Sequence, residues 1–197
     1  MATPVIEFEP TGLEGVILVK PAVWKDPRGF FLETYHQEKY QAHGIPLPFV
    51  QDNHSFSVRG TLRGLHAQLR HPQGKLVRAI LGTIYDVAVD ARPDSPTFGQ
   101  WVGEELSSEN HHQLYVPPGY VHGFVVLSET AHVQYKCTDF YYPEEEISVL
   151  WNDPDIGIDW PVKDPILKEK DRNAPRLAEI AHRLRSGEQG HEGQQGP

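Results

Sequence analysis

Glycine, histidine and proline recur at fixed intervals in two stretches of this chain, and these intervals constrain its fold more than any other feature. In the first stretch, five residues separate Gly60 from His66-Ala67-Gln68, and six separate Lys75 from Gly82. The second stretch is Pro117-Pro118-Gly119-Tyr120-Val121-His122. Glycine and proline in short clusters favour many short strands over long helices.

The two stretches resemble the paired metal-binding motifs of cupins, which are small β-barrels. In that pattern His-x-His is followed by a glutamate, but here the second histidine is replaced by Gln68 and the glutamate by Lys75. Divalent cations prefer imidazole, thiolate or carboxylate ligands, and an ammonium group repels them. The motif that ends in His122 is intact. We therefore expect a cupin-type jelly-roll barrel without a metal site and with a basic pocket.

Short apolar runs between glycine and proline turns predict an all-β fold. The runs Leu76–Leu81 and Ile84–Val89 flank Gly82-Thr83, a turn suited to a hairpin, and Gly123–Ser128 is expected to pair with Ala131–Thr138. Further strands are expected at Val16–Val19, Phe30–Tyr35, Leu114–Val116 and Ile147–Trp151.

A few short helices complete the predicted domain. One is expected near Gln37 to Ala42, and another near the C-terminus, where Leu177, Ile180 and Leu184 have helical spacing. The chain of 197 residues contains no repeat or linker, so residues 1–185 are expected to form a single jelly-roll domain. Residues 186–197 contain no hydrophobic residue and are expected to be disordered.

Charge and composition exclude several classes of partner. The formal net charge of −9 argues against binding to nucleic acid, whose phosphates require a basic face. The only cysteine, Cys137, excludes an intramolecular disulfide. No apolar run resembles a signal peptide or is long enough to span a membrane, so we expect a cytoplasmic protein with no membrane partner.

An ordered series of motifs identifies the chain as similar to the dTDP-4-dehydrorhamnose 3,5-epimerase family, over roughly residues 5–178. The motifs are Asp26-Pro27-Arg28-Gly29-Phe30-Phe31, Gln51-Asp52-Asn53-His54-Ser55, Leu62-Arg63-Gly64-Leu65-His66, Gln73-Gly74-Lys75-Leu76-Val77-Arg78, Asp86-Val87-Ala88-Val89-Asp90, Ser95-Pro96-Thr97-Phe98-Gly99, Pro117-Pro118-Gly119, Tyr135-Lys136-Cys137-Thr138 and Trp151-Asn152-Asp153-Pro154. The resemblance implies an isomerase, a homodimer, that acts on a thymidine-diphosphate 4-keto-6-deoxyhexose without metal or organic cofactor.

Epimerisation beside a C4 ketone needs a base, because the proton on the neighbouring carbon is removed to form an enolate. His66 is the candidate base, since the ordinary pKa of histidine suits proton abstraction at neutral pH. The resemblance implies that Asp171 orients its ring. A buried hydrogen-bonded histidine is the usual alternative for His66, and the motif and the resemblance together favour the base. Without the resemblance, a solvated charge is the preferred interpretation of Asp171.

The enolate also needs a stabilising charge and an acid on the opposite face. Lys75 is the candidate for stabilising the developing charge on the C4 oxygen, although an exposed lysine without a role is the simpler alternative. The resemblance implies that Tyr135 is the acid. A period of two along the strand puts Tyr135 on the same face as Val133 and Cys137, so its side chain is expected to point inward, and a core tyrosine is the competing interpretation.

The resemblance also implies a set of substrate-binding residues, among which Tyr141 stacks on the thymine and Arg28, Arg63 and Lys170 contact the diphosphate or the sugar. Guanidinium groups suit phosphate oxygens. The remaining residues of the set are Glu33, Gln51, Asp52, Asn53, His122 and Glu146. Arg28 is also compatible with a simple turn, and Glu146 with a solvated acidic run.

The sequence leaves open which carbons are inverted. Inversion at both C3 and C5 is favoured because Tyr135 is present, with inversion at C3 only or C5 only as the alternative. A metal-dependent cupin oxygenase is disfavoured by Gln68 and Lys75. A sugar-nucleotide-binding cupin without catalysis would not need both Lys75 and Tyr135.

Overall fold

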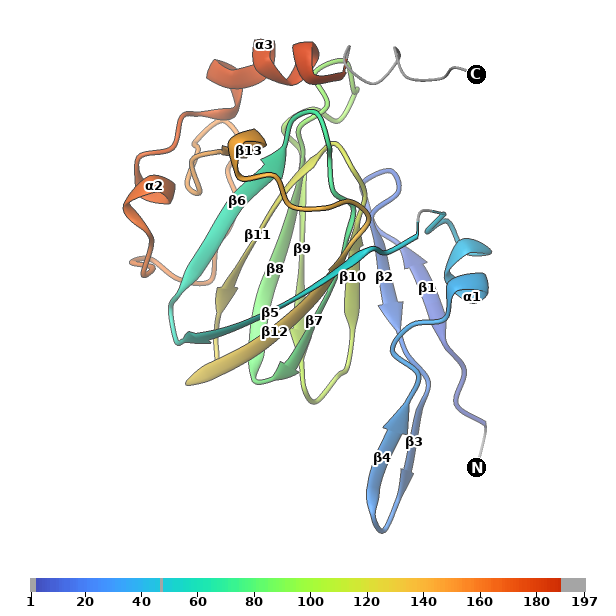
Figure 1. Cartoon of the computed structure of the whole chain (residues 1–197). Coiled ribbons are helices and arrows are strands. Elements are labelled where there is room, and N and C mark those ends of the chain that lie inside the picture. Colours follow the sequence, from blue (N-terminus) through green and yellow to red (C-terminus); the bar gives the residue numbers. More distant parts are fainter. Residues whose placement is uncertain (1–2, 47, 189–197) are drawn as a thin grey trace, which may run out of the picture.

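Two antiparallel β-sheets pack face to face, and a small hairpin projects from them (Figure 1). A computed structural model describes residues 3–46 and 48–188. The six-stranded sheet has the order β1-β2-β10-β7-β12-β5, the five-stranded sheet has the order β13-β6-β11-β8-β9, and β3 and β4 form the hairpin. The strands are β1 (Glu7–Pro10), β2 (Ile17–Lys20), β3 (Val23–Asp26), β4 (Gly29–Leu32), β5 (Gln51–Val58), β6 (Leu62–Gln68), β7 (Lys75–Leu81), β8 (Thr83–Asp90), β9 (Trp101–Ser107), β10 (Gln113–Val116), β11 (Tyr120–Val126), β12 (Thr130–Cys137) and β13 (Glu146–Ser148). The helices are α1 (Gln37–Gln41), η1 (Pro143–Glu145), α2 (Glu169–Arg172) and α3 (Leu177–Glu188). The predicted all-β jelly-roll class is confirmed.

The two predicted hairpins are wrong, although their strands exist. β7 pairs with β10 and β12 in one sheet, whereas β8 pairs with β9 and β11 in the other. Likewise, β11 and β12 belong to different sheets. The connection after β7 is a corner at which the chain crosses between sheets. Gly82 has a φ of +79° there, and a Cβ on it would come 2.1 Å from the carbonyl oxygen of Thr130, so only glycine fits.

The interior between the sheets is apolar toward one edge and polar toward the other. Side chains from β2, β8 and β10, including Leu18, Ile84 and Leu114, form a buried apolar cluster. Toward β5 and β6 the inward side chains are polar instead, and the space between the sheets is not filled. The sheets therefore leave a cavity along one edge of the barrel.

The outer faces of both sheets are also partly covered. On the five-stranded sheet, Trp160, Leu177 and Ile180 from the C-terminal segment and α3 pack on Leu65 and Val121. On the six-stranded sheet, Tyr40 of α1 packs in a second outer cluster. This C-terminal segment also carries α2 to the open edge of the barrel (Figure 1).

Both predicted helices are present as α1 and α3. α3 continues to Glu188, so that three residues of the stretch that we expected to be disordered are helical. Residues 189–197 of that expected tail lie outside the described residues. Within residues 3–46 and 48–188, no helix has both the length and the apolar character that a membrane crossing requires.

Candidate active site

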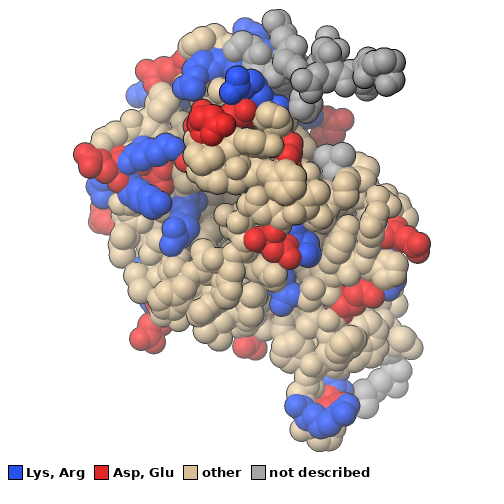
Figure 2. Space-filling model, viewed as in Figure 1, with Lys and Arg blue, Asp and Glu red and all other residues tan. Residues whose placement is uncertain are grey.

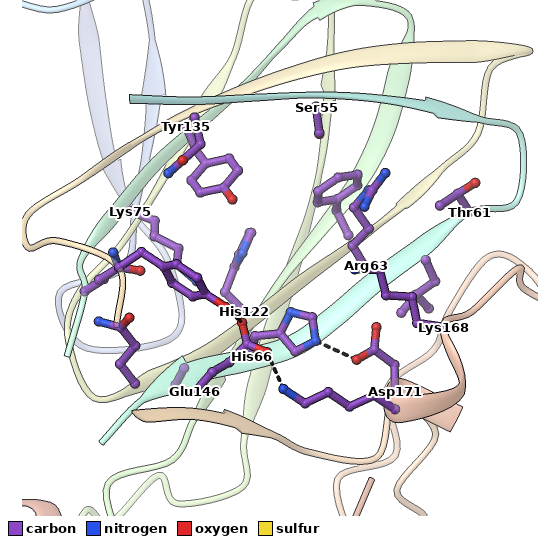
Figure 3. A pocket seen from close by; sticks show the side chains of 18 of the residues that line it. Ser55, Thr61, Arg63, His66, Lys75, His122, Tyr135, Glu146, Lys168 and Asp171 are labelled. Atoms are coloured by element: carbon purple, nitrogen blue, oxygen red, sulfur yellow. Dashed lines mark hydrogen bonds and ion pairs between the residues drawn. The ribbon is translucent and has the colours of Figure 1, made fainter. Parts of the chain in front are cut away.

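A cavity of about 550 Å³ opens between the two sheets, at the polar edge of the barrel. It is lined by inward-facing residues of β5, β6, β7, β11 and β12 and by residues at and near β13 and α2 (Figure 3). All of the predicted site residues line it except Arg28, Glu33 and Asp52. The cavity therefore gathers side chains from segments that are more than a hundred residues apart.

His66 projects into the cavity from β6 and is held by Asp171 of α2. Its Nε2 lies 2.7 Å from Oδ1 of Asp171, which is only 2% exposed. A carboxylate accepts a hydrogen bond from Nε2–H, so the Nδ1 atom of a neutral ring keeps its lone pair. Nδ1 is thus the atom available to accept a proton from a ligand.

A second histidine lies beside the first. His122 on β11 is the direct cross-strand partner of His66, so both side chains are on the inner face of the sheet. The Nε2 atom of His122 lies 2.8 Å from Oδ1 of Asp86, which is fully buried on β8. Burial raises the pKa of Asp86, while His122 and Lys75 oppose that shift. Two histidines therefore line the cavity, and each is hydrogen-bonded to an aspartate.

The opposite wall contributes an ammonium group and a phenol. Lys75 of β7 and Tyr135 of β12 come from the six-stranded sheet, whereas His66 comes from the five-stranded sheet (Figure 3). Burial lowers the pKa of Lys75 and raises the pKa of Tyr135. At neutral pH the phenol therefore retains its proton and can act as an acid.

The rim of the cavity is held by a chain of polar contacts around Glu146. Its carboxylate accepts hydrogen bonds from Tyr141 Oη at 3.0 Å and from Lys170 Nζ. Burial acts to raise the pKa of Glu146, but hydrogen bonds from Lys170 and Tyr141 and the charge of His66 hold it below its ordinary value. The backbone N–H of Tyr141 donates to Gln51 Oε1 at 3.0 Å. These contacts fix an exposed aromatic ring and a cation at the entrance.

Arg63 and Asn53 extend the polar lining along the inner wall. Arg63 donates from Nε to Ser57 Oγ at 3.0 Å, and Asn53 donates from Nδ2 to Cys137 Sγ at 3.4 Å. Figure 2 shows lysine and arginine side chains gathered on the left of the view, on the side where Figure 1 draws α2. The cavity can therefore attract an anionic ligand, despite the negative net charge of the chain.

The chain is similar to known proteins over most of its length. The profile of the dTDP-4-dehydrorhamnose 3,5-epimerase family matches residues 10–179. The chain belongs to this family of epimerases. The dTDP-4-dehydrorhamnose 3,5-epimerase of Pseudomonas aeruginosa is 59% identical over 166 residues, which cover 83% of this chain and 92% of that protein.

Two further relatives differ in the reaction that their names describe. One is the dTDP-6-deoxy-D-glucose-3,5-epimerase RmlC from Legionella pneumophila Philadelphia 1, whose crystal structure is in complex with dTDP-4-keto-L-rhamnose. It has a TM-score of 0.88 and 46% identity, and the match covers 91% of this chain and 97% of that chain. The dTDP-4-dehydrorhamnose 3-epimerase of Streptomyces niveus is 39% identical over 176 residues, covering 88% of this chain and 85% of that protein.

Three predicted site residues of the epimerase lie outside its cavity. Asp52 points to the outer face of β5, where its carboxylate accepts from Lys136 Nζ at 3.0 Å. The alternation of a strand explains this, since Gln51 and Asn53 point inward. Arg28 lies at the tip of the β3–β4 hairpin, with its side chain 89% exposed and paired with Asp26.

Glu33, the third of these residues, follows the hairpin. Its Oε1 accepts a hydrogen bond from Lys39 Nζ at 2.8 Å. Neither Arg28 nor Glu33 can reach the cavity of its own chain from these positions, because the hairpin projects away from the barrel (Figure 1).

Several lining residues of the epimerase were missed by the sequence prediction. Ser55 has a buried Oγ with no hydrogen-bond partner among the described residues, and Gln73 and Lys168 also line the cavity. The period of two along β5 could have indicated Ser55, because it shares a face with Gln51 and Asn53. Nothing in the local sequence indicated Lys168, which lies on an irregular segment before α2.

Gln68 occupies a metal-ligand position of the cupin pattern but has a structural role in this epimerase. Its Nε2 donates to the carbonyl oxygens of His71 at 2.7 Å and Phe140 at 3.0 Å, and its Oε1 accepts from the backbone N–H of Tyr142 at 2.6 Å. In the part of the chain that the structure describes, no three His, Cys, Asp or Glu side chains come together in a way that could hold a metal ion.

Proposed function

We propose that the epimerase inverts C3 and C5 of a thymidine-diphosphate 4-keto-6-deoxyhexose. The observation that carries this proposal is the placement of an imidazole and a phenol on opposite walls of one cavity, with an ammonium group in the same cavity. Inversion needs a base on one face of the sugar ring and an acid on the other. The likeness to relatives named 3,5-epimerases supports the same assignment.

In the proposed reaction, His66 Nδ1 removes the proton from a carbon next to the C4 ketone, and the C–H electron pair forms the enolate. The ammonium of Lys75 stabilises the negative charge on the C4 oxygen, and Asp171 stabilises the imidazolium. Tyr135 then donates its phenolic proton to the opposite face of the carbon. The resulting phenolate recovers a proton from water, and the His66 imidazolium releases its proton to water, so that both groups return to their starting states. The same steps at the second carbon complete a double inversion.

The nucleotide is proposed to bind at the rim. Tyr141 is 48% exposed and held by Glu146, so its ring is available to stack on thymine. Arg63 and Lys170 supply positive charge for the diphosphate, and Lys168 adds a cation beside them. Gln51, Asn53 and His122 supply hydrogen-bonding groups for the sugar along the inner wall.

Deuterium incorporation tests the proposed function directly. The substrate is incubated with the epimerase in deuterium oxide, and the product is reduced with a 4-ketoreductase and examined by NMR. Deuterium at both C3 and C5, together with an L-rhamnose nucleotide, is the expected result. Exchange and inversion confined to C3 would contradict the double inversion and would favour the reaction in the name of the Streptomyces niveus relative.

We further propose that the epimerase is a homodimer in which the β3–β4 hairpin of one protomer reaches the cavity of its partner. The hairpin exposes Phe30 and Phe31, which are 58% and 70% accessible. Beside them lies Arg28, whose guanidinium group is paired with Asp26 but remains exposed. Exposed aromatic side chains of this size are enriched at interfaces. Contact with a partner explains how Arg28 and Glu33 can take part in substrate binding although they lie outside the cavity of their own chain.

Mixing two inactive variants tests this arrangement. Arg28→Ala and His66→Asn are purified separately, then mixed under conditions that allow subunits to exchange. If Arg28 acts across the interface, the mixed dimer contains one intact site, and activity rises above that of either variant. Unchanged activity in mixtures shown by mass spectrometry to contain mixed dimers would place Arg28 in its own subunit's site or in none.

We also propose a cytoplasmic location, which the single unpaired cysteine supports.

A further inference from the structure

Three glutamine side chains hold the irregular segment that carries Tyr141. This segment, residues 139–142, lies between β12 and η1. Gln73 donates from Nε2 to the carbonyl oxygen of Asp139 at 2.9 Å, and Gln51 accepts at Oε1 from the backbone N–H of Tyr141 at 3.0 Å. The third glutamine is on β6, whereas Gln51 is on β5 and Gln73 lies just before β7. Three separate parts of the barrel therefore fix the backbone of one short segment.

The third glutamine, Gln68, binds the segment on both sides of Tyr141. Its Nε2 donates to the carbonyl oxygen of Phe140 at 3.0 Å, and its Oε1 accepts from the backbone N–H of Tyr142 at 2.6 Å. The other hydrogen on Nε2 is donated to the carbonyl oxygen of His71 at 2.7 Å. Both amide hydrogens are thus already bonded, and the residue is only 5% exposed. Gln68 therefore has no hydrogen left to donate to a ligand and acts on the site through the segment.

The ring of Tyr141 depends on such anchors because it stands at the rim of the cavity and is 48% exposed. Its phenol donates to Glu146 Oε2 at 3.0 Å. Glu146 is the cross-strand partner of Gln68, so β6 and β13 together fix the phenol and the peptide groups beside it. An exposed side chain loses conformational freedom when it binds a ligand, and anchoring it beforehand lowers that cost.

We propose that Gln68 is a positioning residue for recognition of the nucleotide base. By bonding the peptide groups on both sides of Tyr141, it places the ring for stacking before the nucleotide binds. It plays no part in the proton transfers at His66 and Tyr135. This inference rests on the proposed function, in which Tyr141 stacks on thymine.

A purely structural role for Gln68 makes a different prediction. Irregular segments in any protein need partners for their buried peptide groups, so loss of Gln68 could lower stability without any effect specific to the nucleotide. The two roles differ in one respect. If Gln68 acts by placing the ring, its effect on nucleotide affinity disappears when the ring of Tyr141 is absent.

A double-mutant cycle measured by calorimetric titration with thymidine diphosphate tests this dependence. Tyr141→Ala is expected to weaken binding by roughly 5- to 100-fold, the range for loss of a base–aromatic stack. Gln68→Ala is expected to weaken it by about fivefold, and to cause no further loss in the Tyr141→Ala protein. An unchanged affinity in folded Gln68→Ala, or an equal loss with and without the ring, would overturn the proposal and leave the proposed function standing. Unchanged binding in Tyr141→Ala would instead remove the proposed stacking, and this inference with it.

A ligand without a base and a variant outside the cavity serve as controls. Inorganic pyrophosphate is expected to bind Gln68→Ala as tightly as the wild type, and equal weakening of both ligands would contradict the proposal. The control variant is Ser128→Ala. Ser128 Oγ accepts from the backbone N–H of Thr83 at 2.8 Å and donates to the carbonyl oxygen of Thr130 at 2.6 Å, in a turn away from the cavity. Loss of these backbone contacts is expected to leave the affinity for thymidine diphosphate unchanged.

Turnover provides a second measurement that a structural defect would not reproduce. In Gln68→Ala, KM is expected to rise by about fivefold while kcat changes by less than about twofold, because the base and acid are untouched. If Gln68→Ala does not fold, Gln68→Met takes its place, since methionine has a similar length and leaves the peptide groups without a partner. A loss of kcat at unchanged KM would contradict the proposal. The calorimetric cycle needs no turnover, so its outcome does not depend on which carbons are inverted.

Discussion

Strand β8 buries two aspartates four residues apart, and they show opposite behaviour. Asp86 and Asp90 are both 0% exposed. The Asp90 carboxylate accepts hydrogen bonds from Arg92, Ser95 and Thr97, and these partners outweigh its burial and lower its pKa to about 2. Among the described residues, the Asp86 carboxylate has a single hydrogen-bond partner, His122, and burial raises its pKa.

This comparison shows that burial alone does not decide what an aspartate does. At Asp90 every lone pair that burial removes from water finds a donor, so the charge stabilises the fold. At Asp86 one oxygen finds no hydrogen-bond donor in the part of the chain that the structure describes, and an unsatisfied buried oxygen lowers the stability of the fold. The two ends of β8 thus place two residues of the same type in different polar environments.

The largest expected effect is on turnover, and it follows from a substitution in the cavity. His66→Asn is expected to lower turnover by roughly 10²–10⁴, the range for loss of a general base, with little change in nucleotide affinity. Asp171→Asn is expected to act in the same direction but more mildly, since Asp171 orients the ring and does not itself remove the proton. Steady-state kinetics and calorimetric titration with thymidine diphosphate provide the measurement. Near-normal turnover in a folded His66→Asn protein would remove the residue from this role.

The next largest effect is on stability at Asp90, and it depends on pH. The pKa of Asp90 is lowered in the folded protein, so its contribution to stability is present above the unfolded value of 3.8 and is lost as pH falls toward about 2. Asp90→Asn is therefore expected to lower the free energy of unfolding by about 2 kcal/mol at neutral pH, and the difference from wild type is expected to shrink in acid. Denaturant unfolding at several pH values would measure it. A difference that does not change with pH would mean that shape, not charge, is responsible.

A smaller effect on stability is expected at Asp86. Asp86→Asn removes a buried charge that has an unpaired oxygen, so the free energy of unfolding is expected to change by less than about 1 kcal/mol, or to rise. The same unfolding experiment applies. If Asp86→Asn is destabilised as much as Asp90→Asn, the contrast between the two aspartates is wrong.

Chelation should have the smallest effect. Because Gln68 and Lys75 occupy two positions of the metal-binding pattern, dialysis against a chelator is expected to leave turnover unchanged. Elemental analysis of the purified protein provides the parallel measurement. A stoichiometric transition metal, with activity lost in chelator and restored on its return, would overturn the assignment of the oxygen-stabilising charge to Lys75.

Much of the fold was predictable because the alternation of side chains along a strand can be recognised in its local sequence. The period of two along residues 131–138 indicated the inward face that carries Tyr135, and the structure has Val133 and Cys137 buried on that face. The same rule, applied to β5, would have excluded Asp52 from the cavity and included Ser55. The motif around His66 indicated that this side chain faces the cavity, because ligand spacing in a barrel is set by residues close together in sequence.

Pairing between strands was not predictable in the same way. The short turn at Gly82 is compatible with a hairpin, but the chain crosses there to the other sheet. Alternation along a strand reports which side chains face inward and not which strand lies beside it, so the local pattern of β7 and β8 could not distinguish the two arrangements.

By itself, then, the sequence determined the class of fold, the inward face of each motif and the family, because these depend on periodicity and spacing within short segments. The resemblance had already paired Asp171 with His66, 105 positions away. Only the tertiary structure decided that His122 lies directly beside His66, and that one oxygen of Asp86 has no hydrogen-bond partner among the described residues. These features arise from contacts between distant segments. Such contacts depend on how whole sheets pack and on which polar groups find partners, and no local pattern of residues records that outcome.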